Sequence, residues 1–284
     1  MLIVSERRGF TLAEVVLSVA MTLVIAGASY SLLVATQRLA RLQGERVTLQ
    51  ASVRAGSLIV LEELGDLGTV EGGTPEQNDI VAAGPSAVTY RAMRGIGFIC
   101  QAPNTTTIRL ARSSFSGHRD PQAGRDVAYV FVPGDPEAKT NDSWDPARIV
   151  SVATSAPCPG SSGAGISLTL DGSPSLLMPE TGTPVRITEL MELRLYQAAG
   201  RSWLGARSVS TGEAIQPLVG PLIGAQGFQL EYLDGSGAPT TDRTRIKSIR
   251  AKLRGITDAP GAVPPAPVEE ELITQMTLRN SLQP

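Results

Sequence analysis

Apolar positions dominate the first part of the chain. An uninterrupted apolar segment runs from Phe10 to Ala35, and Glu14 is its only charged side chain. At about 1.5 Å per helical residue this segment is roughly 39 Å long, which is enough to cross a bilayer core of about 30 Å with some tilt. The pattern therefore predicts a membrane-spanning helix over residues 10–35.

The helical spacing continues past the membrane segment in an amphipathic form. Arg46 and Gly56 interrupt the apolar stripe, and Gly65 and Gly68 are the residues near which the helix should end. The pattern predicts one helix of about 55 residues, in which the membrane half is followed by an amphipathic half over 36–66 that needs a surface to cover. The stripe consists of Leu39, Leu42, Leu49, Val53 and Val60.

Several later segments alternate apolar and polar residues with a period of two. This period is typical of half-buried antiparallel strands, whose apolar faces would pack on the helix stripe. The sequence therefore predicts an α+β fold, one long N-terminal helix packed on an antiparallel β-sheet, with a single β-rich domain over residues 67–284. The alternating residues are Val88, Tyr90 and Ala92; Ile108 and Leu110; Val127, Tyr129 and Phe131; Met191, Leu193 and Leu195; Phe228, Leu230 and Tyr232; Ile249, Ala251 and Leu253; Met276 and Leu278.

Turn and loop residues separate these segments. Asp171-Gly172 and Asp234-Gly235 are hairpin signals, because such pairs tolerate positive φ. Stretches rich in proline, glycine and polar residues predict loops over 133–146, 155–165 and 258–268. The last of these loops should join the final two strands.

Charge indicates a membrane topology but no nucleic-acid surface. The 284-residue chain has a formal net charge of −2, and this balance gives no general attraction for nucleic acid. Arg7 and Arg8 lie just before the apolar segment. By the positive-inside rule, the leader over residues 1–9 stays cytoplasmic and the chain after about residue 36 is exported.

Glu14 is the anomaly of the membrane segment. A carboxylate near the start of a membrane helix is costly, and we find no partner for it within the segment. If the chain were cut after Gly9, Phe10 would carry a new ammonium group close to Glu14. The same ammonium group on a neighbouring parallel helix, staggered by one step, would neutralise the carboxylate in that register only.

The run Gly9-Phe10-Thr11-Leu12-Ala13-Glu14, after two arginines and before an apolar helix, resembles the class III signal of type IV prepilins and type II secretion pseudopilins. The resemblance implies that a membrane aspartic peptidase cuts between Gly9 and Phe10, that the new amino terminus is N-methylated, and that Glu14 guides filament assembly. Residues 185–284 are similar in their order of elements to PilW-type minor pilins and J-type minor pseudopilins. A secretory signal peptide fits less well, because the apolar run is long and no A-x-A site closes it.

The resemblance implies a non-enzymatic subunit, without a cofactor, of the tip or initiation complex of a type IV pilus or type II secretion pseudopilus. Its partners would be the prepilin peptidase, other minor pilins or pseudopilins contacted through the N-terminal helix, and the inner-membrane assembly platform. The chain would cross a bacterial inner membrane once, with its globular domain in the periplasm, and then enter the filament. The sequence leaves open the choice between pilus and secretion system. It also leaves open an envelope enzyme or binding protein with an uncleaved signal anchor.

Few residues suggest other chemistry. Cys100 and Cys158 are the only cysteines, and in an exported domain we expect them to form a disulfide that closes a loop of about 58 residues, with two unpaired buried thiols as the alternative. No zinc site is expected, because a structural zinc needs four ligands and His118 is the only histidine. Ser114, His118 and Asp120 have the residue types of a nucleophilic triad, but triad members usually come from separate elements, so we expect a solvated loop histidine and no catalytic site.

Two further patterns have both a structural and a functional interpretation. A dense basic run on a strand would point its first three side chains to one face and its last three to the other. We favour a charged strand face that also discourages edge pairing. The alternative is a docking site for an acidic partner or DNA. Asp234, Ser236 and Asp242 offer oxygen ligands for calcium but lack the acidic density of a metal site, so a turn is expected. The basic residues are Arg243, Arg245, Lys247, Arg250, Lys252 and Arg254.

Overall fold

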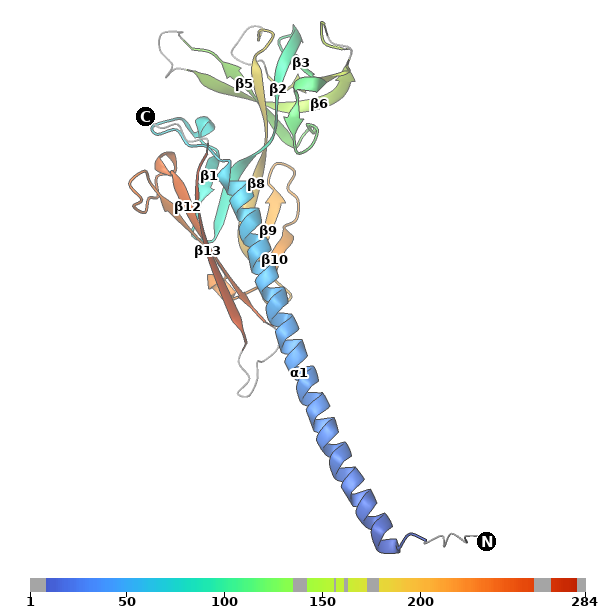
Figure 1. Ribbon diagram of the computed structural model, residues 1–284. Coiled ribbons are helices and arrows are strands. Elements are labelled where there is room, and N and C mark those ends of the chain that lie inside the picture. Colours follow the sequence, from blue (N-terminus) through green and yellow to red (C-terminus); the bar gives the residue numbers. More distant parts are fainter. Residues whose placement is uncertain are drawn as a thin grey trace.

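The computed structural model describes residues 9–134, 142–155, 157–160, 163–172, 179–257 and 267–279. Within these ranges one long helix, α1 (Leu12–Gly65), precedes a large antiparallel β-sheet. The predicted α+β class with one long N-terminal helix is therefore confirmed. Figure 1 shows the last part of α1 lying along the strands while its first part projects away from them.

The strands differ widely in length. β2 and β8 are the longest, with 18 and 15 residues, and they pair with each other. The strands are β1 (Ile80–Ala83), β2 (Ala87–Asn104), β3 (Thr107–Ala111), β4 (Ser116–Gly117), β5 (Asp126–Val132), β6 (Ser143–Ser155), β7 (Gly165–Leu170), β8 (Pro184–Ala198), β9 (Arg201–Ser208), β10 (Gln216–Leu222), β11 (Phe228–Leu233), β12 (Ser248–Ile256) and β13 (Glu269–Thr277). The short 3₁₀ turns are η1 (Pro75–Gln77), η2 (Arg112–Ser114), η4 (Gly224–Gln226) and η5 (Arg243–Arg245).

Helix α1 ends where its sequence predicts. Gly65 is its last residue, and the backbone N–H of the C-cap, Asp66, donates to the Leu64 carbonyl. The apolar stripe is buried only from Leu49 onward, however, and Leu39 is 56% exposed. The reason is that α1 contacts the sheet through β10, β12 and β13, which lie along the last part of the helix (Figure 1).

The first hydrophobic core lies between α1 and the strands nearest to it. Leu49, Val53, Val60 and Leu64 of the helix pack on inward side chains of β2, β8, β9, β10, β11 and β12 and on the end of β13. The expected packing of the helix stripe on alternating strands is thus confirmed for this part of the chain. The alternating residues buried here are Val88, Tyr90, Ala92, Leu193, Phe228, Leu230, Tyr232, Ile249, Ala251, Leu253, Met276 and Leu278.

The second core is enclosed by strands alone. β2, β3, β7, β6, β5 and β8 pair in succession, and β8 pairs back with β2, so the strands close into a barrel. Ile99, Ile149, Ile166 and Ile187 are among the side chains that fill it. The middle of the chain therefore forms a lobe with its own core, which shares β2 and β8 with the helix-covered part.

The barrel changes the faces on which two predicted strands pack. Ile108 and Leu110 of β3 lie in the barrel core rather than against α1, so that part of the packing prediction was wrong. In β5, Ala128 and Val130 face the barrel core, because the pairing of β5 with β6 and β8 turns this side of the strand inward. Val127, Tyr129 and Phe131, which the alternation predicted to be buried, lie on the other face of β5, where Tyr129 is buried and the other two are half-buried.

The two predicted hairpin turns have different outcomes. Asp234 begins a tight turn in which the Gly237 N–H donates to the Asp234 carbonyl. This turn does not join β11 to β12 directly, since residues 234–247 lie between the two strands. The hairpin prediction at Asp171-Gly172 was wrong, because β7 pairs with β3 and β6 and not with the following strand β8.

The predicted loops lie between strands. The loop predicted over 133–146 is shorter than expected, because β6 already begins at Ser143. β6 and β7 flank the second loop, and β12 and β13 flank the third, as expected. Residues 135–141, 156, 161–162 and 258–266 in these segments lie outside the described residues.

Strand β8 changes one of its neighbours midway. From Val185 to Glu189 it pairs with β5, and from Met191 to Ala198 it pairs with β9, while β2 stays on its other side as far as Arg194. β5 and β9 therefore diverge, and a fork opens between them where the two cores meet.

Two glycines allow the helix and the sheet to approach closely. A Cβ on Gly56 of α1 would lie 2.5 Å from Cγ2 of Val219 on β10, and a Cβ on Gly255 of β12 would lie 2.5 Å from Cδ1 of Leu49. Gly56, which the sequence pattern presents as an interruption of the stripe, is a contact position. Its missing side chain sets the helix–sheet distance.

We expect Gly56→Ala to destabilise the fold by about 1–3 kcal/mol, because the added methyl group overlaps a short branched side chain that cannot rotate away. Gly44→Ala is the matched control, since nothing lies within 4 Å of a Cβ there. Alanine at that position should stabilise the helix by up to about 1 kcal/mol. Urea unfolding of the full chain in detergent measures both changes, and equal midpoints for the two variants would contradict the close approach.

Candidate functional site

The predicted processing motif lies at the exposed start of α1. Gly9 and Phe10 precede the helix, and the Phe10 side chain is 87% exposed. Thr11 is the N-cap residue, with extended backbone angles of φ −73° and ψ 150°. Arg7 and Arg8, which were predicted to flank the membrane segment, lie outside the described residues.

Glu14 forms a capping box with Thr11. The Glu14 Oε2 atom accepts hydrogen bonds from the Thr11 backbone N–H and from its hydroxyl, both at 3.0 Å, and the Glu14 N–H donates to the Thr11 hydroxyl at 3.3 Å. The expectation that the segment offers no partner was therefore wrong for hydrogen bonds; the spacing of threonine and glutamate is the signal of this motif. No described residue supplies a cation within ion-pair distance of Glu14, whose polar contacts among these residues are the hydrogen bonds with Thr11.

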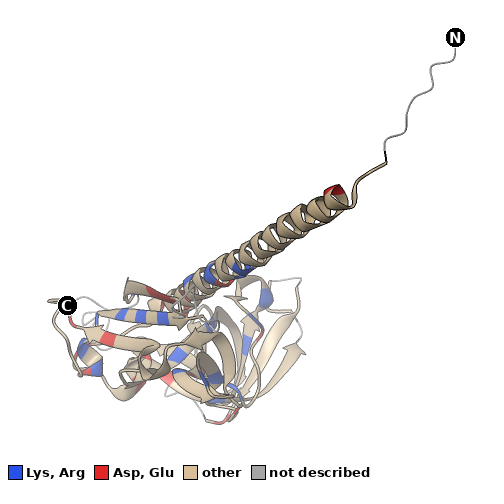
Figure 2. Ribbon diagram, turned by 90° about the horizontal axis from the view of Figure 1, so that it is seen from below, with Lys and Arg blue, Asp and Glu red and all other residues tan. Residues whose placement is uncertain are grey.

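The apolar half of α1 is exposed along its length. Every residue from Gly9 to Leu33 is exposed, and α1 is long and apolar enough to cross a membrane. Figure 2 shows that this half is free of basic residues and carries an acidic residue near its start. Several of its hydroxyl groups donate to carbonyls one turn earlier in the helix, which satisfies them in a lipid environment. These pairs are Ser18 with Val15, Thr22 with Ser18, Ser31 with Ala28 and Thr36 with Leu33.

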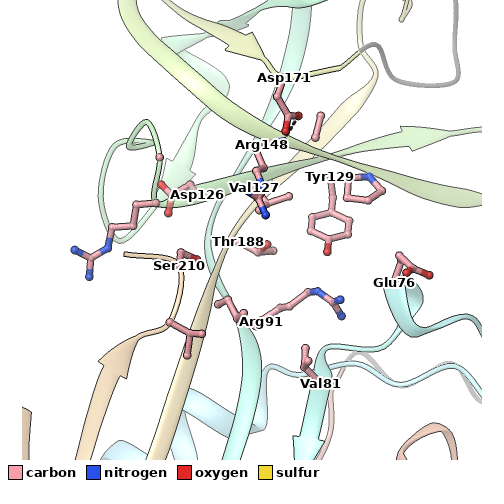
Figure 3. Close-up of a pocket in the computed structure, with 16 residues that line it drawn as sticks. Glu76, Val81, Arg91, Asp126, Val127, Tyr129, Arg148, Asp171, Thr188 and Ser210 are labelled. Carbon is pink, nitrogen blue, oxygen red and sulfur yellow. Dashed lines mark hydrogen bonds between the residues drawn. The ribbon is translucent and has the colours of Figure 1, made fainter. Parts of the chain in front are cut away.

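A cavity of about 630 Å³ opens at the fork between β5 and β9 (Figure 3). Thr188 and Leu190 of β8 line it together with Val127 and Tyr129 of β5. Burial raises the pKa of the Tyr129 hydroxyl above its usual range. The alternation in β5 predicted Tyr129 as a core residue, so no pattern in the sequence indicated this cavity.

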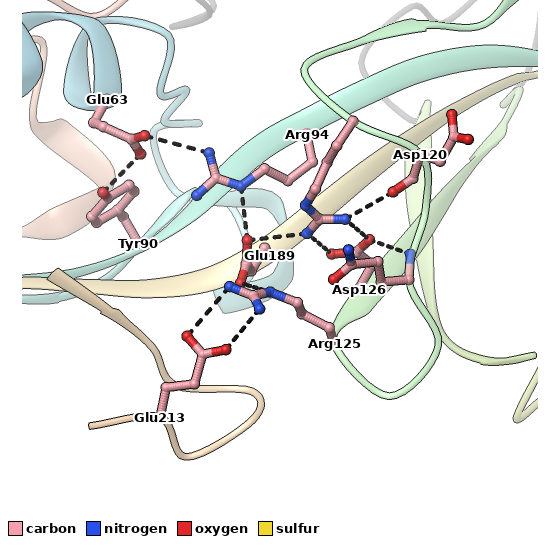
Figure 4. Close-up of polar contacts among 10 residues, drawn as sticks. Glu63, Tyr90, Arg94, Asp120, Arg125, Asp126, Glu189 and Glu213 are labelled. Carbon is pink, nitrogen blue, oxygen red and sulfur yellow. Dashed lines mark hydrogen bonds and ion pairs between the residues drawn. The ribbon is translucent and has the colours of Figure 1, made fainter. Parts of the chain in front are cut away.

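A cluster of ion pairs lies beside the fork (Figure 4). Its centre is Glu189 of β8, whose side chain is only 2% exposed. Arg94 donates to the Glu189 carboxylate at 2.8 Å, Arg119 donates at 3.1 Å, and Arg125 also donates to it. Three guanidinium groups thus surround one buried carboxylate.

The arginines of this cluster also bind acids on other elements. Arg119 forms a bidentate pair with Asp126, which is fully buried, with two bonds of 2.6 Å. Arg94 reaches Glu63 of α1 at 3.4 Å. The remaining contacts are Arg125 with Glu213 at 2.7 Å and the Tyr90 hydroxyl with Glu63 at 2.9 Å. The cluster therefore links α1, β2, β5 and β8 where the two cores meet.

One pattern in the sequence does indicate a buried charge at this cluster. Val185, Ile187, Met191 and Leu193 alternate along β8, and Glu189 occupies the same row. A carboxylate in an inward-facing row of apolar residues needs cationic partners. The partners come from distant parts of the chain, however, and only the folded structure identifies them.

The structure joins Cys100 and Cys158 in a disulfide, with their Cα atoms 5.7 Å apart. Cys100 lies on β2, and Cys158 lies in the connection between β6 and β7 and is buried. The bridge fastens this connection to the barrel. It is structural and lies apart from the amino-terminal motif.

Ser114, His118 and Asp120 do not assemble into a triad. The Ser114 hydroxyl donates to the Ala111 carbonyl at 3.0 Å, and Asp120 pairs with Arg112 at 2.8 Å. His118 is exposed, and its backbone N–H donates to the Arg94 carbonyl. The solvated-loop interpretation of this histidine agrees with these contacts.

The basic run divides between two elements. Residues 243–245 form the 3₁₀ turn η5, and Lys247 precedes β12, so the prediction that all six residues lie on one strand was wrong. The three basic residues on β12 face glutamates on the adjacent strands, which supports a charged strand face. These pairs are Arg250 with Glu231 at 2.6 Å, Lys252 with Glu271 at 3.0 Å and Arg254 with Glu269 at 3.0 Å. β12 pairs with β11 on one side and with β13 on the other, so the expectation that the run discourages edge pairing was wrong.

The residues considered for calcium form two separate turns. The Asp234 Oδ1 atom accepts from the N–H and the hydroxyl of Ser236 at 2.9 and 2.7 Å, and Asp242 caps η5 by accepting from the Thr244 N–H. Their carboxylates are thus occupied by local hydrogen bonds. Within the described residues, no group of three or more acidic, histidine or cysteine side chains is placed to hold a metal ion.

No family model, curated protein or solved structure matches this chain. Its function is therefore inferred from its own residues and their geometry.

We expect Glu189→Gln to destabilise the protein by roughly 3 kcal/mol at neutral pH, because three arginines lose their shared carboxylate. Burial alone would raise the pKa of Glu189, but the hydrogen bonds it accepts lower it from 4.5 to about 2. The stabilisation is therefore complete above about pH 4.5 and is lost as the pH falls towards 2. Urea unfolding of both proteins should show their difference shrinking across this interval.

Glu213→Gln is the matched control for this experiment. It also removes a carboxylate from an arginine of the cluster, but the Glu213 side chain is 41% exposed, so the change should be small. A difference between wild type and Glu189→Gln that stays constant on acidification would contradict the assigned role of Glu189.

Proposed function

We propose that this chain is a minor pilin or pseudopilin. It would be a non-enzymatic structural subunit of the tip or initiation complex of a type IV pilus or a type II secretion pseudopilus. The observation that carries the proposal is Glu14: an acid without a compensating cation among the described residues, at the start of a helix half that is apolar and fully exposed. Such a charge has a function if another chain supplies the cation.

Cleavage between Gly9 and Phe10 would generate that cation. The exposure of both residues ahead of the helix supports access by a membrane peptidase. The capping box turns the Glu14 carboxylate back towards the helix start, which is the end at which a neighbour's Phe10 ammonium group would arrive in a parallel, staggered bundle. The pairing would select one stagger, because other registers leave the acid buried without a partner.

The projecting half of α1 would have two roles, one before and one after filament assembly. In the bilayer it keeps the subunit in the membrane, and in the filament it packs among similar helices. Exchanging lipid for other apolar helices is nearly isoenergetic, so small specific terms such as the Glu14 pairing decide the arrangement. The remainder of α1 is held by the first core and would fix the β-rich body on the end of this element.

A second class of function is a membrane-anchored binding protein or envelope enzyme with an uncleaved anchor. The cavity at the fork between β5 and β9 favours it, because a filament subunit does not require a pocket of that size. The two classes differ in what happens to the leader.

Co-expression with a prepilin peptidase tests the processing step. We expect residues 1–9 to be removed and Phe10 to carry a methyl group, both seen by mass spectrometry of the amino-terminal peptide. Gly9→Val should block cleavage, since a side chain at that position obstructs the scissile bond. Gly27→Val, at an exposed position within the helix, should leave it unchanged. Retention of Met1 in the wild type would favour the anchored class and contradict the proposal.

A substitution of Glu14 tests the assembly step separately. Glu14→Gln removes the charge but keeps an oxygen that accepts from Thr11 in a capping box. We expect the variant to insert and be processed, but to recover at least about tenfold less of the partner pilins in affinity purification, as for the loss of a buried ion pair. Thr11→Val removes the capping hydroxyl, keeps the charge and should retain the partners. An equal loss in both variants would assign Glu14 to helix capping alone.

A further inference from the structure

The cavity at the fork between β5 and β9 results from the topology of the body. β8 leaves β5 and joins β9 within a few residues, so the sheet opens where Thr188 and Leu190 lie. Glu76 of η1 and Ser210 after β9 close its sides. Its volume of about 630 Å³ lies within the roughly 300–1,000 Å³ range of small-molecule sites.

Three polar groups in this cavity have no hydrogen-bond partner among the described residues. Tyr129 is only 7% exposed and Thr188 only 2%, yet neither hydroxyl is bonded to another described residue. The Arg148 guanidinium, which also lines the cavity, pairs with no described acid. Figure 3 shows Tyr129 and Thr188 turned towards the same space. The Tyr129 and Thr188 hydroxyl oxygens are not sealed in the interior but open into the cavity, and the Arg148 side chain is exposed, so all three groups are available to a ligand.

The walls around these groups are held in place. Arg91 donates from Nη1 to the Pro75 carbonyl at 3.0 Å and also to the Asn78 carbonyl, and its guanidinium lies 5.9 Å from the centre of the Tyr129 ring. Asp171 accepts from the Arg148 backbone N–H at 2.8 Å. A site fixed in this way loses little conformational entropy when a ligand binds.

The charges of the lining select the kind of ligand. Arg91, Arg125 and Arg148 are balanced by Glu76, Asp126 and Asp171. Asp126 and Arg125 are already paired with residues of the Glu189 cluster, so the groups that remain include both donors and acceptors without a net charge. An anionic ligand would meet the carboxylates of Glu76 and Asp171. A neutral ligand whose hydroxyl groups both donate and accept matches donors and acceptors alike.

We propose that this cavity is a binding site for a neutral saccharide. The Tyr129 and Thr188 hydroxyls and the Arg148 guanidinium bond its hydroxyl groups, the carboxylates of Glu76 and Asp171 accept from them at the rim, and Val127 and Leu190 contact its apolar ring face. The inference is independent of filament assembly, because the site lies in the β-rich body and uses no residue of α1.

A glycan array of neutral and acidic mono- to tetrasaccharides tests the proposal. The probe is the full chain, fluorescently labelled and kept in an amine-oxide detergent, since glycosidic detergents would compete for the site. We expect neutral saccharides to bind. A soluble hit is then titrated by calorimetry against the wild type and variants.

Tyr129→Phe and Thr188→Val each remove one hydroxyl with little change of shape, and each should weaken binding roughly fivefold. Tyr196→Phe, on the same strand β8 as Thr188 but outside the cavity, is the matched control and should bind like the wild type. Circular dichroism confirms that the variants are folded. Binding of acidic saccharides only, the absence of any saccharide binding, or equal binding by all variants would overturn the proposal. None of these results bears on leader cleavage or on Glu14.

Discussion

The fold of this protein depends on the burial of one face of α1, a single uninterrupted helix. From Leu49 to Leu64, α1 lies against the sheet closely enough that Gly56 and Gly255 have no room for a side chain. Because the helix is continuous from Leu12 to Gly65, the contact that holds its C-terminal part against the sheet also sets the direction of its N-terminal part. The exposed apolar half therefore projects from the β-rich body as a direct continuation of the docked helix (Figure 1).

Two long strands hold the two parts of the β-rich body together. β2 and β8 run through both cores, so the barrel and the helix-covered sheet share a backbone frame. A junction of this kind cannot be filled by apolar packing alone, since β5 and β9 diverge there. The Glu189 cluster fills part of the junction with ion pairs, and the cavity opens directly beside it, with Arg125 and Asp126 shared by both. Rigidity and an opening thus arise from one topological feature.

The amino-terminal motif and the cavity use polar groups in contrasting ways. At Glu14 the hydrogen bonds are satisfied within the helix by Thr11, but the charge is not compensated by any described residue. At Tyr129 and Thr188 it is the hydrogen-bonding capacity that is unused. Each observation points to a group supplied from outside the chain, an ammonium group in the first case and hydroxyl groups in the second. The proposed filament role and the proposed saccharide site are therefore compatible in one protein.

The long helix, its end at Gly65 and most strands of the first core follow from the pattern of the sequence alone. Helical and strand periods are local properties, and burial against a single partner preserves them. The sequence also contained the capping box of Thr11 and Glu14. That β5 turns Ala128 and Val130 inward is visible only in the folded protein, because closure of the barrel depends on pairings between distant strands. For the same reason only the tertiary structure brought Arg94, Arg119 and Arg125 to Glu189 and opened the cavity beside them: the partners of a buried charge are chosen by topology, which no local pattern encodes.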